Sequence, residues 1–123
     1  GPSERAGRIA FAFMGSTNAP SDPYPRTDER YRGVRWNAYI GMTVNALSAR
    51  PVFLAASVND PRDPLVEGTC APVRCQAEYD FLDVEVARDG TPWAVMIDAC
   101  LDGTCSPLGE DIVGRLVGGP PLN

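Results

Sequence analysis

The sequence predicts an all-β fold of antiparallel strands, and three observations support this class. The 123 residues include 12 glycines and 12 prolines, which interrupt helices and mark turns. Between these turn formers, apolar residues alternate over short stretches, as they do in strands. No stretch carries apolar residues at helical spacing over the usual length of a helix. The length itself corresponds to one domain.

The pattern predicts six strands, at residues 8–14, 36–44, 52–58, 81–87, 93–98 and 112–117. The first is apolar on both faces, which predicts a strand that is buried on both sides. Asp89-Gly90 lies between the fourth and fifth strands and predicts a tight type I′ hairpin, because this pair readily adopts positive φ. Three long connections complete the pattern, and loops of this length are often functional: 16–35, 59–79 and 99–109.

The composition excludes several classes of chemistry. The chain has no histidine, which excludes Ser-His-Asp and Cys-His nucleophiles and histidine-ligated zinc or haem. All 11 basic residues are arginine, so Schiff-base lysine chemistry is excluded as well. The net charge of −5 argues against binding to nucleic acid or to an anionic membrane surface. No apolar run reaches the ~18–20 residues that a membrane-spanning helix needs.

Four cysteines form two pairs with the same C-x4-C spacing: Cys70 with Cys75, and Cys100 with Cys105. An even number of cysteines in a small acidic chain is typical of an oxidising compartment, so we expect disulfides and a secreted or cell-surface location. Each pair lies in a short loop segment, and we expect it to close locally. A four-cysteine zinc site, which usually uses C-x2-C, and free thiols are the alternatives.

The order of strands and loops resembles the sialidase-like (BNR-repeat) β-propellers of the secreted actinobacterial type. The segments that carry the resemblance are GRIAFAFMG (7–15), RWNAYIGMTVNA (35–46), PVFLAASVNDP (51–61) and YDFLDVEVARDGTPWAVMIDAC (79–100). The resemblance implies that residues 1–123 are one all-β segment of a propeller, with the end of one blade at 7–61 and the start of the next at 79–117. Remaining blades or another chain would then complete the sheets. The alternative is that these strands close on themselves in a smaller sandwich.

The Asp box of that family, S-x-D-x-G-x-T-W, braces the turn between the third and fourth strands of a blade. The matching stretch here is 43–53, where Asn45 stands in the place of the aspartate and Phe53 in that of the tryptophan. The glycine is missing and the spacing is longer, so the box is degenerate.

The resemblance places the three long loops on one ligand-binding face. Sialidases hold a carboxylate with clustered arginines and use a tyrosine–glutamate pair with an aspartate. The matching residue types give Tyr79, Asp80 and Asp98 as catalytic candidates and Arg35, Arg74 and Glu78 as ligand-binding candidates.

Solvated loop charges are the alternative role for these residues. Glu78 and Tyr79 are adjacent and would point to opposite faces of an extended chain, so they do not simply pair. Asp80 enters one strand where Asp98 leaves the next, so we expect their carboxylates to lie close together. No cofactor is expected, because Asp98 and Asp102 are too few ligands to indicate a Ca²⁺ site.

Two functions remain. The favoured one is a secreted or cell-surface propeller segment that binds a glycan or a protein without catalysis, because no complete set of acid and nucleophile is visible. The alternative is a fragment of an exo-sialidase-like glycoside hydrolase that cuts glycosidic bonds with carboxylate, tyrosine and arginine residues.

Overall fold

A computed structural model of the chain describes residues 5–22, 32–67, 82–98 and 110–123. This part of the chain contains strands and no helix, so the prediction of an all-β, antiparallel fold is confirmed. The strands are β1 (Ile9–Gly15), β2 (Arg35–Thr43), β3 (Leu54–Ser57), β4 (Val66–Glu67), β5 (Leu82–Val86), β6 (Pro92–Asp98) and β7 (Glu110–Arg115).

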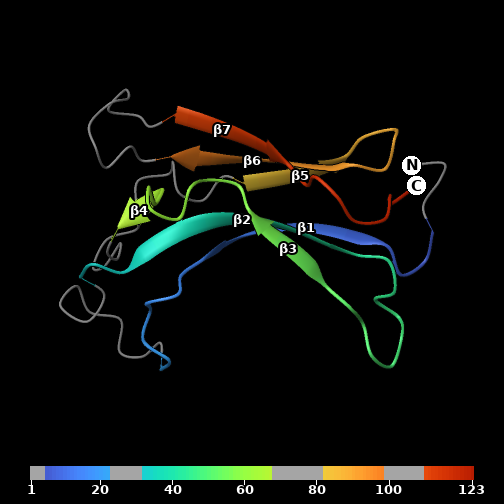
Figure 1. The fold of residues 1–123 in the computed structure, drawn as a ribbon, viewed down its shortest axis with the longest axis horizontal. Coiled ribbons are helices and arrows are strands. Elements are labelled where there is room, and N and C mark those ends of the chain that lie inside the picture. The colour runs from blue at the N-terminus through green and yellow to red at the C-terminus, as the bar shows by residue number, and fades with distance from the viewer. Residues whose placement is uncertain (1–4, 23–31, 68–81, 99–109) are drawn as a thin grey trace.

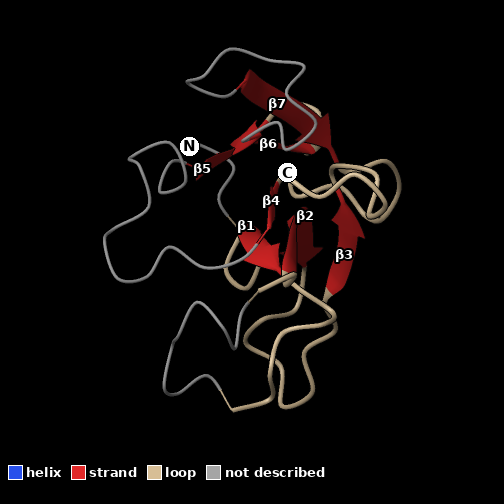
Figure 2. Cartoon of the chain, turned by 90° about the vertical axis from the view of Figure 1, so that its left-hand side faces the viewer, coloured by secondary structure: helices blue, strands red, loops and turns tan. Residues whose placement is uncertain are grey.

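The strands form two sheets that lie one above the other (Figures 1 and 2). The first sheet has the order β1-β2-β3, and the short β4 also pairs with β2. The second has the order β5-β6-β7. Across the layers, β1 contacts β5 and β2 contacts β6. Both architectures left open by the sequence, a propeller fragment and a closed sandwich, stack sheets face to face in this way.

The core lies between the two sheets. It is built by the inward-facing side chains of β2 and β6, together with three leucines from the connections and the C-terminal tail; its buried members are Ala38, Ile40, Met42, Leu65, Ala94, Met96, Leu116 and Leu122. Alternation on β2 explains this arrangement, because residues two apart lie on the same face of a strand. Burying one such leucine stabilises the fold by about 1.5–3 kcal/mol.

The C-terminal tail closes one end of the space between the two sheets. The Leu122 N–H donates to the Gly90 carbonyl at 3.0 Å, and the Arg8 guanidinium donates to the Pro121 carbonyl at 2.9 Å. Leu122 is buried, so the tail is part of the core. Arg8, just before β1, and the C-terminal tail therefore lie at the same end of the molecule (Figure 1).

The prediction that the first strand is buried on both faces is wrong. Its inner residues Ala10 and Ala12 pack against the core, whereas Ile9 is 47% exposed and Phe13 is 38% exposed. The reason is the number of layers: β1 has a sheet against its inner face alone. Its outer face remains an apolar surface.

The third strand is shorter than the predicted 52–58, because the Val52 N–H donates to the side chain of Asn45 at 2.9 Å instead of to a neighbouring strand. The predicted Asp-Gly hairpin is present, but it is not a two-residue type I′ turn. The Gly90 N–H donates to the Ala87 carbonyl, the Ala87 N–H donates to the Thr91 carbonyl, and Gly90 has a φ of 83°. This is a three-residue connection with glycine in the left-handed position.

The strand β4 was not predicted, since it falls inside the expected loop 59–79 and contains two residues. Its pairing with Arg35 and Trp36 extends β2 beyond the end of β3. The apolar pair Leu65-Val66 within a polar stretch is the sequence signal for it, and Leu65 is fully buried.

Candidate functional site at the loop-bearing end

The strand ends that lead into the long connections lie at one end of the molecule. Gly15 pairs with Asn37 where β1 ends and β2 begins, and Asp98 pairs with Glu110 where β6 ends and β7 begins. Both pairs and β4 lie on the left in Figure 1, and Figure 2 shows this end face-on. We call it the loop-bearing end. Most residues of the three long connections lie outside the described residues, so the expectation that they share one face stays a prediction.

An asparagine side chain joins the two ends of the first long connection by hydrogen bonds. The Asn18 amide donates to the Gly33 carbonyl at 2.9 Å, and its Oδ1 accepts the Arg35 N–H at 2.9 Å. The side chain thereby substitutes for the backbone ladder just beyond the last β1–β2 pair. Fixed strand ends of this kind hold binding loops on a rigid base.

A second asparagine fills the gap where β2 changes partners from β3 to β4. The Asn59 Oδ1 accepts the Ala38 N–H at 2.9 Å, and its amide donates to the Asn37 Oδ1 at 2.9 Å and to the Asp63 carbonyl at 2.7 Å. Buried polar groups need such partners, because an unpaired one costs about 1–3 kcal/mol. Asn37 is itself buried, so Asn59 satisfies an amide inside the fold.

Arg35 is the predicted ligand-binding arginine whose position is described. Its Nε lies 3.8 Å from Glu67 Oε2, and the two residues are paired across β2 and β4. Both side chains are largely exposed, so the ion pair contributes little to stability. An arginine has five N–H donors, more than one carboxylate accepts. The Arg35 guanidinium therefore has N–H donors beyond those that Glu67 uses.

Asp98 is the catalytic candidate whose position is described. It ends β6, is half-buried and stands opposite Glu110 in the β6–β7 ladder. The sequence reasoning missed Glu110, since it treated the following strand as beginning at residue 112. The predicted partner Asp80 lies outside the described residues, as do all the following: Tyr79, Arg74, Glu78, Asp102, Cys70, Cys75, Cys100 and Cys105.

Asp60 and Arg62 form a close ion pair in the turn that follows Asn59. The Arg62 Nη2 lies 2.6 Å from Asp60 Oδ2, and the Arg62 N–H also donates to this carboxylate at 2.9 Å. These hydrogen bonds lower the pKa of Asp60 from 3.8 to about 2 and raise the pKa of Arg62. The pair was not predicted, although the spacing D-x-R in a Pro-containing turn is a signal for it.

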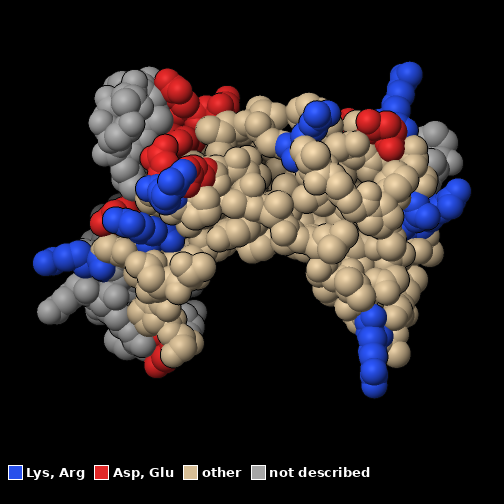
Figure 3. Space-filling model, viewed as in Figure 1, with Lys and Arg blue, Asp and Glu red and all other residues tan. Residues whose placement is uncertain are grey.

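Charges of both signs lie at the loop-bearing end and also at the opposite end, whereas the middle of the face seen in Figure 3 is mainly uncharged. Within residues 5–22, 32–67, 82–98 and 110–123, no group of three or more His, Cys, Asp or Glu side chains could hold a metal ion.

The turn at the opposite end of β2 is braced by Asn45, the residue in the aspartate position of the degenerate Asp box. Its Oδ1 accepts the Val52 N–H at 2.9 Å and the Thr43 hydroxyl at 3.0 Å. Phe53, in the tryptophan position, packs edge-on against Phe11 at 5.9 Å between ring centroids. The Asn45 side chain thus braces the turn formed by residues 43–53.

The comparisons with known proteins give no relative: no family model, no curated protein and no solved structure matches the chain. In the part of the chain with described coordinates, no helix is long and apolar enough to cross a bilayer.

Proposed function

We propose that the chain is a non-catalytic binding segment of a secreted or cell-surface β-propeller, and that its loop-bearing end binds a glycan. One observation carries the proposal: the strand ends that bear the long connections lie together, and asparagine side chains fix them. Binding sites built from loops on a rigid sheet are common in β proteins. The bracing by Asn45 supports the propeller assignment.

A glycan fits this end better than an apolar partner. Arg35 and Glu67 are exposed there and carry N–H donors and carboxylate acceptors side by side, which suits the hydroxyl and carboxylate groups of sugars. Asp98 and Glu110 add two further carboxylates. Binding requires this surface alone, whereas hydrolysis also requires an acid and a nucleophile held on either side of the glycosidic bond.

The test is a glycan microarray probed with the purified chain, followed by titration calorimetry of the retained glycans. Replacing Arg35 by Gln should weaken binding about 10- to 100-fold, since a hydrogen bond to a charged group contributes about 1.5–3 kcal/mol. The matched control is Arg88→Gln, an exposed arginine in the hairpin at the opposite end, which should bind as wild type. An array without a retained glycan, or equal losses in both variants, would overturn the proposal.

A hydrolase fragment is the second candidate, and the pairing of Asp98 with Glu110 favours it. Glycosidases use two carboxylates that flank the scissile bond. Release of a fluorophore from an aryl sialoside by the purified chain, abolished by Asp98→Asn, would establish hydrolysis. If the chain releases no fluorophore from sialosides or other aryl glycosides, the hydrolase candidate is wrong.

A further inference from the structure

Strand β7 lies at the edge of the β5–β6–β7 sheet, and among the described residues it pairs with β6 alone (Figures 1 and 2). The Leu116 N–H donates to the Pro92 carbonyl at 3.0 Å, in the same register as the β6–β7 ladder. Antiparallel neighbours alternate between hydrogen-bonded and non-hydrogen-bonded pairs, so the even-numbered residues of β7 bond to β6. The backbone N–H and C=O groups of Asp111, Val113 and Arg115 therefore point away from β6, towards the open edge.

The same three residues carry their side chains on the outer face of the sheet. Ile112, which lies between two of them, packs against the core, and side chains alternate between faces along a strand. Val113 is 63% exposed, and Asp111 and Arg115 are exposed on either side of it. The outer face of β7 thus carries an acidic, an apolar and a basic side chain in order, with Val113 at the centre.

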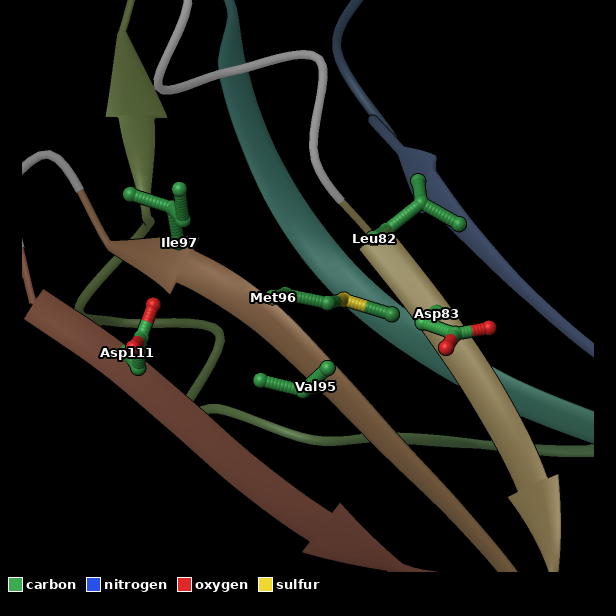
Figure 4. A pocket seen from close by; sticks show the side chains of 6 residues that line it. All are labelled: Leu82, Asp83, Val95, Met96, Ile97 and Asp111. Carbon is green, nitrogen blue, oxygen red and sulfur yellow. The ribbon is translucent and has the colours of Figure 1, made fainter.

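Neither charge on this face has an ion-pair partner in its own chain. The ion pairs within the described ranges involve neither Asp111 nor Arg115. Figure 4 shows Asp111 at one side of a shallow hollow whose other lining side chains are apolar or acidic. The Arg115 guanidinium lies 5.7 Å from the Trp93 ring centroid. Its charge also acts on Asp89, but that carboxylate accepts its hydrogen bond from the Thr91 N–H at 3.0 Å.

An antiparallel second copy of β7 matches this edge when Val113 stands opposite Val113. Asp111 of each copy then stands opposite Arg115 of the other, on the same outer face of the sheet. Every outward N–H and C=O group of the three residues meets an outward C=O or N–H group of the copy. A parallel copy in register would place like charges side by side, which is unfavourable. The charges and the backbone therefore favour the same partner in the same orientation.

From this self-complementarity, we propose that the chain forms a dimer in which β7 pairs antiparallel with β7 of a second copy. The two-fold axis passes beside Val113, and the contact is isologous because one surface meets itself. The two three-stranded sheets become one continuous sheet, and an edge that is otherwise open to aggregation is covered. Glycan binding at the loop-bearing end uses Arg35, which is not part of this contact, so either proposal can fail alone.

The first experiment is sedimentation velocity of the purified chain over a concentration series. We expect a single shift from monomer to dimer as concentration rises, without larger species, because an isologous contact closes on itself. A chain that stays monomeric into the millimolar range overturns the proposal. The edge would then belong to a different chain or to a further strand of a propeller.

Water-to-amide exchange measured by NMR shows which surface forms the dimer. The outward amides of Asp111, Val113 and Arg115 should exchange rapidly with water in the monomer and lose this rapid exchange in the dimer. The amides of Ile112 and Gly114 bond to β6 and should show no rapid exchange at either concentration. A dimer in which the outward amides still exchange rapidly uses another surface, and that result overturns the proposal as well.

Two charge reversals test the register. Asp111→Arg and Arg115→Asp each convert both charge pairs of the dimer into like pairs, so each alone should weaken dimerisation about 10-fold. Mixed in equal amounts, the two variants should form a heterodimer, because every charge again meets its opposite. The double variant Asp111→Arg/Arg115→Asp should dimerise as wild type. A mixture that remains monomeric, or a double variant as weak as the single ones, contradicts the register.

Further variants separate dimerisation from folding. Glu85→Arg and Arg88→Asp make the same charge changes at exposed residues on β5 and in the hairpin that follows it, and both should dimerise as wild type. Val113→Pro removes an N–H that points to the open edge, where a strand tolerates proline. It should keep the circular dichroism of the wild type and lose the dimer. If Val113→Pro dimerises as wild type, or if the two controls weaken dimerisation as much as the charge reversals, the β7 edge is not the interface.

Discussion

The close approach of the two sheets at Gly114 gives the sharpest test of the packing. Gly114 pairs with the buried Ala94 and faces the core from β7, and a Cβ added there would lie 2.5 Å from Val58 Cγ1. Ordinary carbon contacts are about 3.5–4.0 Å, so one of the two sheets must move by about 1 Å. Val58 is β-branched and has little rotamer freedom to relieve the clash.

The expected cost of Gly114→Ala follows from this geometry. Overpacking of a core costs about 1–3 kcal/mol in free energy of unfolding. Alanine by itself is better than glycine in a strand by about 0.5–1 kcal/mol. In the background Val58→Ala, the obstructing methyl groups are absent. There the same substitution should be neutral or stabilise the fold by up to about 1 kcal/mol, so the effect changes sign between the two backgrounds.

Urea unfolding followed by tryptophan fluorescence measures this double-mutant cycle, with Trp93 on the neighbouring strand as reporter. All variants are compared at one low protein concentration. Val113→Ala, next to Gly114 but exposed, is the control and should change the free energy by less than about 0.5 kcal/mol. An equal loss for Gly114→Ala in both backgrounds would show that Val58 does not face Gly114, and would refute this packing of the two sheets.

Three other predictions concern the tail, the braced turn and the ion pair. Leu122→Ala should lower the free energy of unfolding by about 2–4 kcal/mol, measured in urea, whereas the exposed Leu47→Ala should change it little. Asn45→Ala removes the acceptor of two hydrogen bonds and should destabilise the chain by about 1–3 kcal/mol, while Asn45→Asp keeps the acceptor and should be tolerated. The Asp60 carboxyl should titrate near pH 2 by NMR and move back towards 3.8 in Arg62→Gln. Because its folded pKa is lowered, the stabilisation that this pair gives is present above pH 3.8 and is lost as the pH falls towards 2. An unchanged midpoint in Arg62→Gln would exclude the ion pair in solution.

The positions of several candidate-site residues along the chain could be predicted from the sequence. The long connections could be placed at strand ends, and with them Arg35 and Asp98. The partners of these residues could not be found in this way. Glu67 reaches Arg35 through a two-residue strand, and Glu110 stands opposite Asp98 through a ladder that begins two residues earlier than expected. Both contacts join segments far apart in sequence, so no local pattern reports them.

The sequence by itself determined the all-β class and the positions of most strands, because the period of two in apolar residues is a local property of the chain. The tertiary structure decided which apolar residues are buried. Ile9 and Phe13 alternate with Ala10 and Ala12 in a stretch that is apolar throughout, and periodicity cannot distinguish a strand covered on one face from one covered on both. The stacking of β1 on β5 covers the alanines and leaves the aromatic side uncovered. Burial depends on which surfaces meet, and that is set by the packing of the sheets.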